Sequence, residues 1–107
     1  MAVAYKVLAQ SAPSATTATT LLTATSATIV STLNAANLGG TQDTIRIAIR
    51  PAGATLANQH YIAYGVPLAA GAVFSMQGGI TLANTDVITV YSTTGNTAFS
   101  AFGSDGN

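Results

Sequence analysis

The chain has 107 residues, no net charge at neutral pH and 49% hydrophobic residues. Its six charged side chains are Lys6, Arg46, Arg50, Asp43, Asp86 and Asp105. This composition excludes an intrinsically disordered chain, a basic nucleic-acid-binding face and, with no Cys and one His, a structural zinc site.

A period of two dominates the chain, and segments rich in β-branched residues lie between turn residues, so the sequence predicts short β-strands in chain order. We expect strands over 5–10, 19–25, 27–35, 44–50, 59–64, 72–76, 86–92 and 97–102. The 44–50 segment alternates most cleanly, with three isoleucines on one face and Arg46 and Arg50 on the other, until Pro51 ends it. About eight short strands separated by Gly, Pro and Asn turns predict an all-β chain, an antiparallel β-sandwich of jelly-roll type.

A helix is the competing interpretation of the Ala-rich segments. Residues 11–27 contain no apolar stripe at helical spacing, so we reject a long helix there. A single helical turn over 55–58 stays open. The Gly78-Gly79 pair is interpreted as a hairpin turn. The length fits one domain, 1–107.

One segment is repeated at an offset of 26 residues. Thr55-Leu56-Ala57-Asn58 is followed by Thr81-Leu82-Ala83-Asn84, and each copy leads into an expected strand. We expect Leu56 and Leu82 to fill the core at two similar corners of the sandwich. Asn58 and Asn84 are expected to hydrogen-bond the backbone of the turns.

His60 is the one side chain whose ordinary pKa lies near neutrality. A catalytic base would need a carboxylate or nucleophile beside it, and the nearest candidates in the sequence are distant. The chain also lacks a nucleophile elbow, a phosphate-binding loop and a cluster of acids for calcium. We therefore expect no catalytic, metal-binding or cofactor-binding residues, no enzyme activity, and an ordinary turn or interface role for His60.

Arg46 and Arg50 project from the same face of their strand, about 13 Å apart. Either they solvate that face, with Asp43 as a rim partner, or they anchor an acidic patch of another subunit. Tyr61 and Tyr64 are three residues apart, which places them on opposite faces of a regular strand. With His60, these four residues are our candidate contacts with a partner protein.

A carbohydrate-binding sandwich is a further interpretation. Such modules usually expose aromatic residues, and here Tyr61 and Tyr64 would serve. Trp is absent and acids are few, which weakens this interpretation.

Three segments resemble small virion structural proteins of tailed bacteriophages, especially cyanophages. They are 46–54 (RIAIRPAGA), 58–64 (NQHYIAY) and 79–91 (GITLANTDVITVY), with 5–10 (YKVLAQ) and 99–104 (FSAFGS) in the same pattern. The resemblance covers nearly the whole chain apart from 15–28, and no motif in it is catalytic.

The resemblance implies a capsid decoration, or cement, protein. Such a protein would sit on the head surface, bridge subunits of the major capsid protein and stiffen the shell. It would be made in the host cytoplasm, and the sequence shows neither a signal peptide nor a membrane-spanning segment. With no net charge and a small core, we also expect self-association as a dimer or trimer, without nucleic acid or membrane. The alternative is a structural component of the tail, baseplate or fibre.

Overall fold

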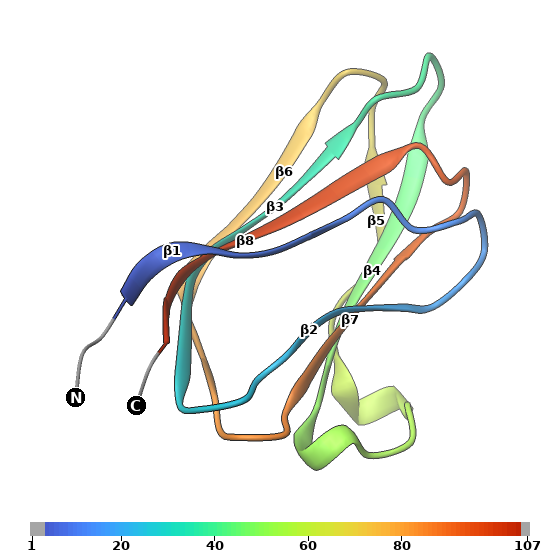
Figure 1. Ribbon diagram of the computed structural model, residues 1–107. Helices are drawn as coiled ribbons and strands as arrows, with labels where there is room; N and C mark the ends of the chain where they lie inside the picture. The colour runs from blue at the N-terminus through green and yellow to red at the C-terminus, as the bar shows by residue number, and fades with distance from the viewer. Residues whose placement is uncertain (1–3, 106–107) are drawn as a thin grey trace.

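Two four-stranded antiparallel sheets pack face to face in the computed structural model, which describes residues 4–105 (Figure 1). The strands in this range are β1 (Ala4–Ser11), β2 (Thr19–Thr23), β3 (Thr28–Asn37), β4 (Asp43–Arg50), β5 (Tyr61–Leu68), β6 (Val73–Leu82), β7 (Val87–Ser92) and β8 (Thr97–Asp105). Sheet A has the order β1-β8-β3-β6 and sheet B the order β2-β7-β4-β5. Two four-stranded sheets connected in this order form a jelly roll, which confirms the predicted fold class.

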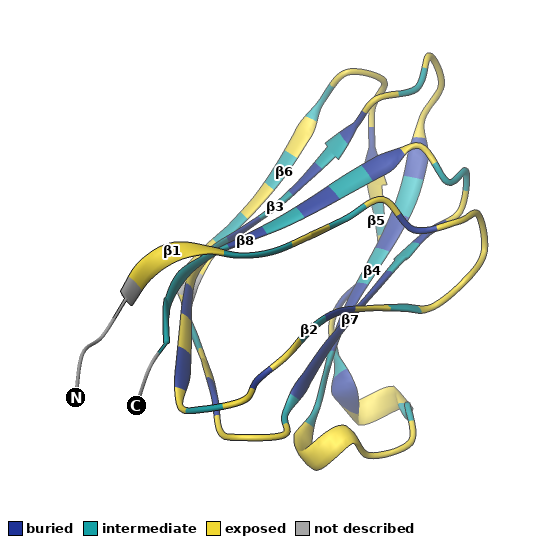
Figure 2. Cartoon of the chain, in the orientation of Figure 1, coloured by how far each residue is buried: buried dark blue, intermediate teal, exposed yellow. Residues whose placement is uncertain are grey.

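The core lies between the sheets and is made by alternate residues of the strands. The predicted isoleucine face of β4 is confirmed, because Ile45 and Ile47 are fully buried and Ile49 packs partly against the core. Phe99 on β8 and Leu33 on β3 are the largest buried side chains opposite them. Each such residue contributes about 1.5–3 kcal/mol relative to an exposed one. Figure 2 shows buried residues concentrated on the central strands, and exposed ones along β1 and β6.

β5 and β6 continue furthest beyond their predicted ends. β5 continues to Leu68, through Gly65 and Pro67. β6 runs through the Gly78-Gly79 pair, so the expected hairpin turn there is wrong. Val30 of β3 pairs with Ile80 and Thr32 pairs with Gln77, which leaves β6 with more residues than β3 between these pairs. The glycines therefore form part of a β-bulge, where Gly79 has a φ of +72°.

No α-helix occurs among residues 4–105, and β2 lies within the Ala-rich segment for which a helix was rejected. The sequence left a single helical turn over 55–58 undecided. The structure has instead two 3-10 turns, η1 (Pro51–Gly53) and η2 (Asn58–His60). They form the corner between β4 and β5 at one end of the sandwich (Figure 1). In the described range, no helix is long and apolar enough to cross a membrane.

The repeated Thr-Leu-Ala-Asn segments do form two corners, although their leucines differ in burial. Leu82 ends β6 and is 3% exposed within the core cluster, as expected. Leu56 is only half-buried and lies outside that cluster, so the expectation that it fills the core is wrong. The corner between β4 and β5 projects further from the sandwich than the turn between β6 and β7 (Figure 1).

A different side chain from the expected asparagine holds the backbone in each corner. His60 Nδ1 accepts a hydrogen bond of 3.0 Å from the Ala57 N–H, three residues earlier. At the same place in the second copy, Asp86 Oδ2 accepts one of 2.9 Å from the Ala83 N–H. The repeat therefore marks two similar turns. In each turn, the side chain two positions after the asparagine accepts the hydrogen bond from the backbone.

Candidate functional site

Arg46 lies on the outer face of sheet B, between two tyrosines on neighbouring strands. It pairs with Tyr64 of β5 on one side and with Tyr91 of β7 on the other. The guanidinium carbon is 4.4 Å from the centre of the Tyr64 ring and 4.2 Å from that of the Tyr91 ring. Both distances are well within the range of a cation–π contact, worth about 0.5–1 kcal/mol each at an exposed site. The two rings thus hold the guanidinium between them.

Tyr61 lies on the same face as Tyr64, which corrects the prediction that they face opposite ways. Ile47 pairs with Ala63 and Ala48 pairs with Tyr61, so Ile62 is an extra residue in β5. This bulge changes the alternation by one position, and both tyrosines point outward. Their rings make an edge-to-face contact with centres 4.8 Å apart. A second bulge at Gly65, whose φ is +68°, brings Tyr64 opposite Arg46.

We call the group formed by Arg46, Asn58, Tyr61, Tyr64 and Tyr91 the Arg46 site. Asn58, Tyr61 and Tyr64 line an open hollow of about 360 Å³, and Tyr64 also contacts the Arg46 guanidinium. Tyr64 is 61% exposed. The site therefore offers a fixed cation, aromatic surface and a side-chain amide to a ligand from outside.

The hydrogen-bonding groups of Arg46 are not used within the described chain. Its Nε is shut off from solvent and has no acceptor. No acceptor among residues 4–105 contacts the two Nη nitrogens, and these keep access to solvent. Because the guanidinium lies between two rings and its Nε is shut off from solvent, a ligand from outside would meet the Nη nitrogens.

Arg50 points to the same side as Arg46 but is bound within the chain. Its Nε donates a hydrogen bond of 3.0 Å to Thr89 Oγ1, and an Nη donates one of 3.1 Å to the Ala54 carbonyl oxygen. These bonds tie the end of β4 to β7 and to the loop after η1. Of the two arginines predicted to contact a partner, Arg46 keeps free N–H donors toward solvent. Arg50 mainly stabilises the corner between β4 and β5.

His60 contributes to the neighbouring corner more than to the surface. The residue is 8% exposed at the end of η2. Because Nδ1 accepts the bond from Ala57, the neutral ring carries its hydrogen on Nε2. The structure therefore gives this candidate contact residue the turn role that the sequence left open.

Asp43 does not pair with either arginine, so its expected place at the rim is wrong. It begins β4 facing the core and is 1% exposed. The hydroxyls of Ser92 and Thr97 donate to its Oδ2, and the N–H groups of Thr44 and Thr94 donate to its Oδ1 at 2.7 and 3.0 Å. Burial alone raises the pKa of Asp43, but these four bonds outweigh it and lower the pKa to about 2.

The remaining charges are also bound within the chain. Lys6 and Asp105 form an ion pair of 3.3 Å where β1 meets the end of β8. Asp86 accepts 2.9 Å bonds from the N–H groups of Ala52 and Ala83, which lower its pKa. Among residues 4–105, Arg46 is thus the charged side chain left without a hydrogen-bonding or ionic partner.

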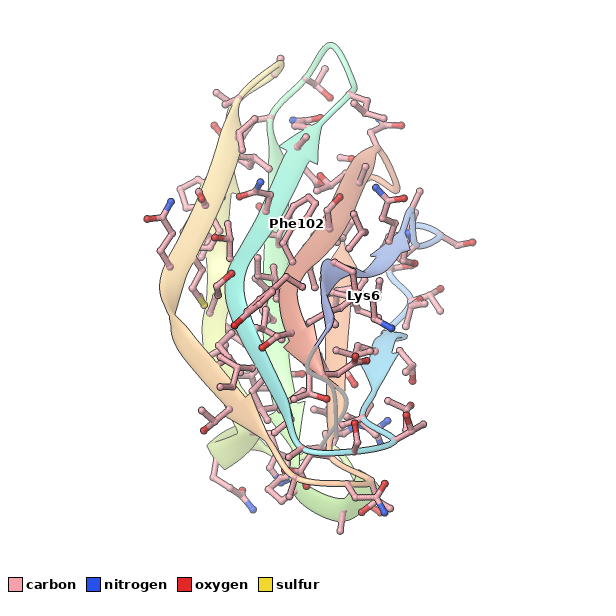
Figure 3. The ribbon with its side chains drawn as sticks, turned by 60° about the vertical axis from the view of Figure 1, so that its left-hand side comes forward. Lys6 and Phe102 are labelled. Atoms are coloured by element: carbon pink, nitrogen blue, oxygen red, sulfur yellow. The ribbon has the colours of Figure 1, made fainter. Side chains whose placement is uncertain are left out.

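The outer face of sheet A differs from that of sheet B, and Figure 3 turns it toward the viewer. Val7 of β1 pairs with Phe102 of β8, and Tyr5 and Ile29 flank Ser104 one row further along. Tyr5, Val7 and Ile29 are 86%, 50% and 48% exposed. Lys6 and Asp105 lie only at the end of this sheet. Sheet A therefore presents an apolar row beside small polar residues, with little charge.

Two members of the Arg46 site are absent from the residues chosen from the sequence. Tyr91 joins the site through its register with Arg46, which links residues 45 positions apart and leaves no local signal. Asn58 was expected to bind its own turn and instead lines the hollow. In the described range, no group of three His, Cys, Asp or Glu side chains is placed to hold a metal ion.

Comparisons of the chain with known protein families, with curated proteins and with solved structures find no match. The fold therefore stands on the strand order and the core described above, and the function must be argued from the surface chemistry.

Proposed function

We propose that this chain is a non-enzymatic structural protein of a bacteriophage virion, a capsid decoration protein that bridges and stabilises subunits of the major capsid protein on the head surface. The proposal joins the sequence resemblance to the surface chemistry. The observation that carries it is the use of the charges: five of the six are bound within the chain, and the outer faces of the two sheets expose apolar side chains, with Arg46 as the unpaired charge among residues 4–105. Surfaces of this kind are covered by protein contacts more readily than by water.

Exposed apolar residues on both sides of the sandwich support a bridging role. Tyr5, Val7 and Ile29 are exposed on sheet A, whereas Ile62 and Tyr64 are exposed on β5 of sheet B. A protein that joins neighbouring subunits needs contacts on more than one side. Burial of these residues in a lattice would contribute the stability that a small, neutral domain gains from partners. Self-association as a dimer or trimer would serve the same end.

Copy number in purified virions of the phage that encodes the chain tests the proposal. We expect several hundred copies per particle by quantitative mass spectrometry, and loss of heat resistance in particles without the protein. A single small ring of copies would instead place the chain in the tail, baseplate or fibre, where cyclic symmetry sets a low number. Absence from the particle would refute a virion role altogether.

A glycan-binding module is the second candidate, and the hollow beside Tyr61 and Tyr64 favours it. Aromatic surface next to the Asn58 amide is chemistry that suits a sugar ring with its hydroxyl groups. This candidate predicts binding of the isolated protein to a glycan array. Binding should be lost in Tyr61→Ala and Tyr64→Ala and kept in Tyr5→Ala, which removes an exposed tyrosine from the other sheet.

A further inference from the structure

We infer that the Arg46 site binds a carboxylate on an acidic segment of the partner protein, so that sheet B is the face that docks. The inference deepens the proposed function and rests on it for the identity of the partner. Its starting point is a cation held between two rings with no anion of its own in the described chain.

The geometry around Arg46 favours an acceptor that is planar and anionic. The guanidinium lies over the rings of both Tyr64 and Tyr91, and its Nη nitrogens stay open to solvent. A carboxylate can accept two parallel N–H bonds from these nitrogens, whereas a neutral carbonyl accepts them more weakly. The guanidinium is already oriented, so little side-chain entropy is lost when the ligand binds.

The surroundings of the site fit a protein segment as the occupant. Ile62 is 45% exposed on the same strand as Tyr61 and Tyr64, so apolar surface lies next to the cation. Tyr and Arg are enriched among the residues that dominate protein–protein binding, where apolar neighbours exclude water from a central polar contact. Charge complementarity then selects Asp or Glu on the partner.

Among residues 4–105, sheet A has no unpaired cation held between aromatic rings. We therefore assign the contact with the partner's carboxylate to sheet B. The cation of sheet A, Lys6, is already paired with Asp105 at the end of the sheet. The Val7–Phe102 row offers apolar contact without a charged anchor. Lys6→Ala therefore removes one positive charge away from the proposed site and is the matched control for Arg46→Ala.

The test uses purified full-length protein and virions of the phage that encodes it, prepared without this protein. Binding is measured by co-sedimentation for wild type, Arg46→Ala, Arg46→Lys and Lys6→Ala. We expect Arg46→Ala to weaken binding at least about tenfold, Arg46→Lys to weaken it less, and Lys6→Ala to bind as wild type. The wild-type affinity should fall with added salt. Equal binding by wild type and Arg46→Ala would overturn the inference and leave the proposed function standing.

A second arm separates failure of the inference from failure of the proposed function. The isolated protein is titrated with a Glu-rich peptide, its Gln counterpart, a uronic-acid oligosaccharide and inorganic phosphate, and the Tyr64 and Tyr91 ring signals are followed by NMR. We expect the Glu-rich peptide alone to shift them, and no shift in Arg46→Ala.

If wild type fails to bind particles but the Glu-rich peptide shifts these signals, the proposed function falls and the carboxylate site stands. A response to the oligosaccharide or to phosphate, without one to the peptide, overturns the inference. Thermal melting of each variant checks the fold. If Arg46→Ala does not fold, Arg46→Lys decides, because it keeps the charge but cannot form two parallel N–H bonds.

Discussion

Asp43 and Asp86 hold backbone at opposite ends of sheet B, in contrasting surroundings. Asp43 begins β4, is 1% exposed and accepts four hydrogen bonds, two of them from hydroxyls. Asp86 lies just before β7, is only half-buried and accepts two bonds from backbone N–H groups. The buried carboxylate joins β4, β7 and β8, so it belongs to the cooperative core. The half-buried one holds a corner and should act locally.

The Arg46 site lies between these two fixed ends. Arg46 is three residues after Asp43 on β4, and Tyr91 is five residues after Asp86 on β7. Because β4 and β7 are antiparallel neighbours, the two carboxylates hold both ends of the pair that carries the site. A docking face with a fixed backbone needs less ordering when a partner binds.

The largest effect is expected at Asp43. Asp43→Ala leaves the Ser92 and Thr97 hydroxyls and two backbone N–H groups without their acceptor in the core, which should lower the free energy of unfolding by about 3 kcal/mol. Urea denaturation measures this change. Asp105→Ala, which removes a carboxylate from the exposed pair with Lys6, should cost less than about 1 kcal/mol. Equal costs for the two variants would contradict the contrast between core and surface.

Lowering the pH should also remove the contribution of the Asp43 carboxylate to the stability of the fold. The pKa of Asp43 is about 2 in the folded chain and 3.8 in its ordinary state. Its contribution is therefore complete above about pH 4 and lost as the pH falls through about 2, which amounts to about 2 kcal/mol. The lowered pKa of Asp86 acts in the same direction. Denaturation at a series of pH values should show this loss in wild type and a much flatter profile in Asp43→Asn.

The sequence predicted the fold well because its signals are local. Alternation, β-branched residues and turn residues together mark all eight strands of the described chain, and the isoleucines of β4 identify the face that packs in the core. It failed where one extra residue shifts the pattern. The bulge at Ile62 turns Tyr61 to the side of Tyr64, and another keeps Gly78-Gly79 inside β6. A bulge depends on the pairing strand, which periodicity does not contain.

The candidate site was predicted only in part, for the same reason. Arg46, Tyr61 and Tyr64 are close in the sequence and were chosen from it, whereas Tyr91 reaches them through strand register. Asp43 likewise finds Ser92 and Thr97 across 49 and 54 residues. The sequence shows that Arg46 and Arg50 share a face, but which of them is already bound depends on Thr89 and a loop carbonyl.

Replacing Asp86 is expected to lower stability less than replacing Asp43, and to act only on the corner around η1. Asp86→Ala frees the N–H groups of Ala52 and Ala83, and Ala52 has a strained φ of 53° that its bond to Asp86 helps to maintain. Hydrogen exchange followed by NMR should become faster at these two amides, while the amides of β4 and β8 stay protected. The melting temperature should fall less than in Asp43→Ala. Faster exchange throughout the core would show that the corner is not a local unit.

A smaller loss of stability than at Asp86 is expected at Arg50, and this variant is most informative in combination with Asp86→Ala. Arg50→Ala removes two bonds to neutral acceptors at a half-buried position, which should cost about 1 kcal/mol. Both residues hold the same short loop, because Asp86 binds the Ala52 N–H and Arg50 binds the Ala54 carbonyl. Once either bond is lost, the loop is free to move and the other bond stabilises it less. The double variant should therefore lose less stability than the two single variants add up to, whereas Asp43→Ala and Arg50→Ala, at opposite ends of β4, should be additive.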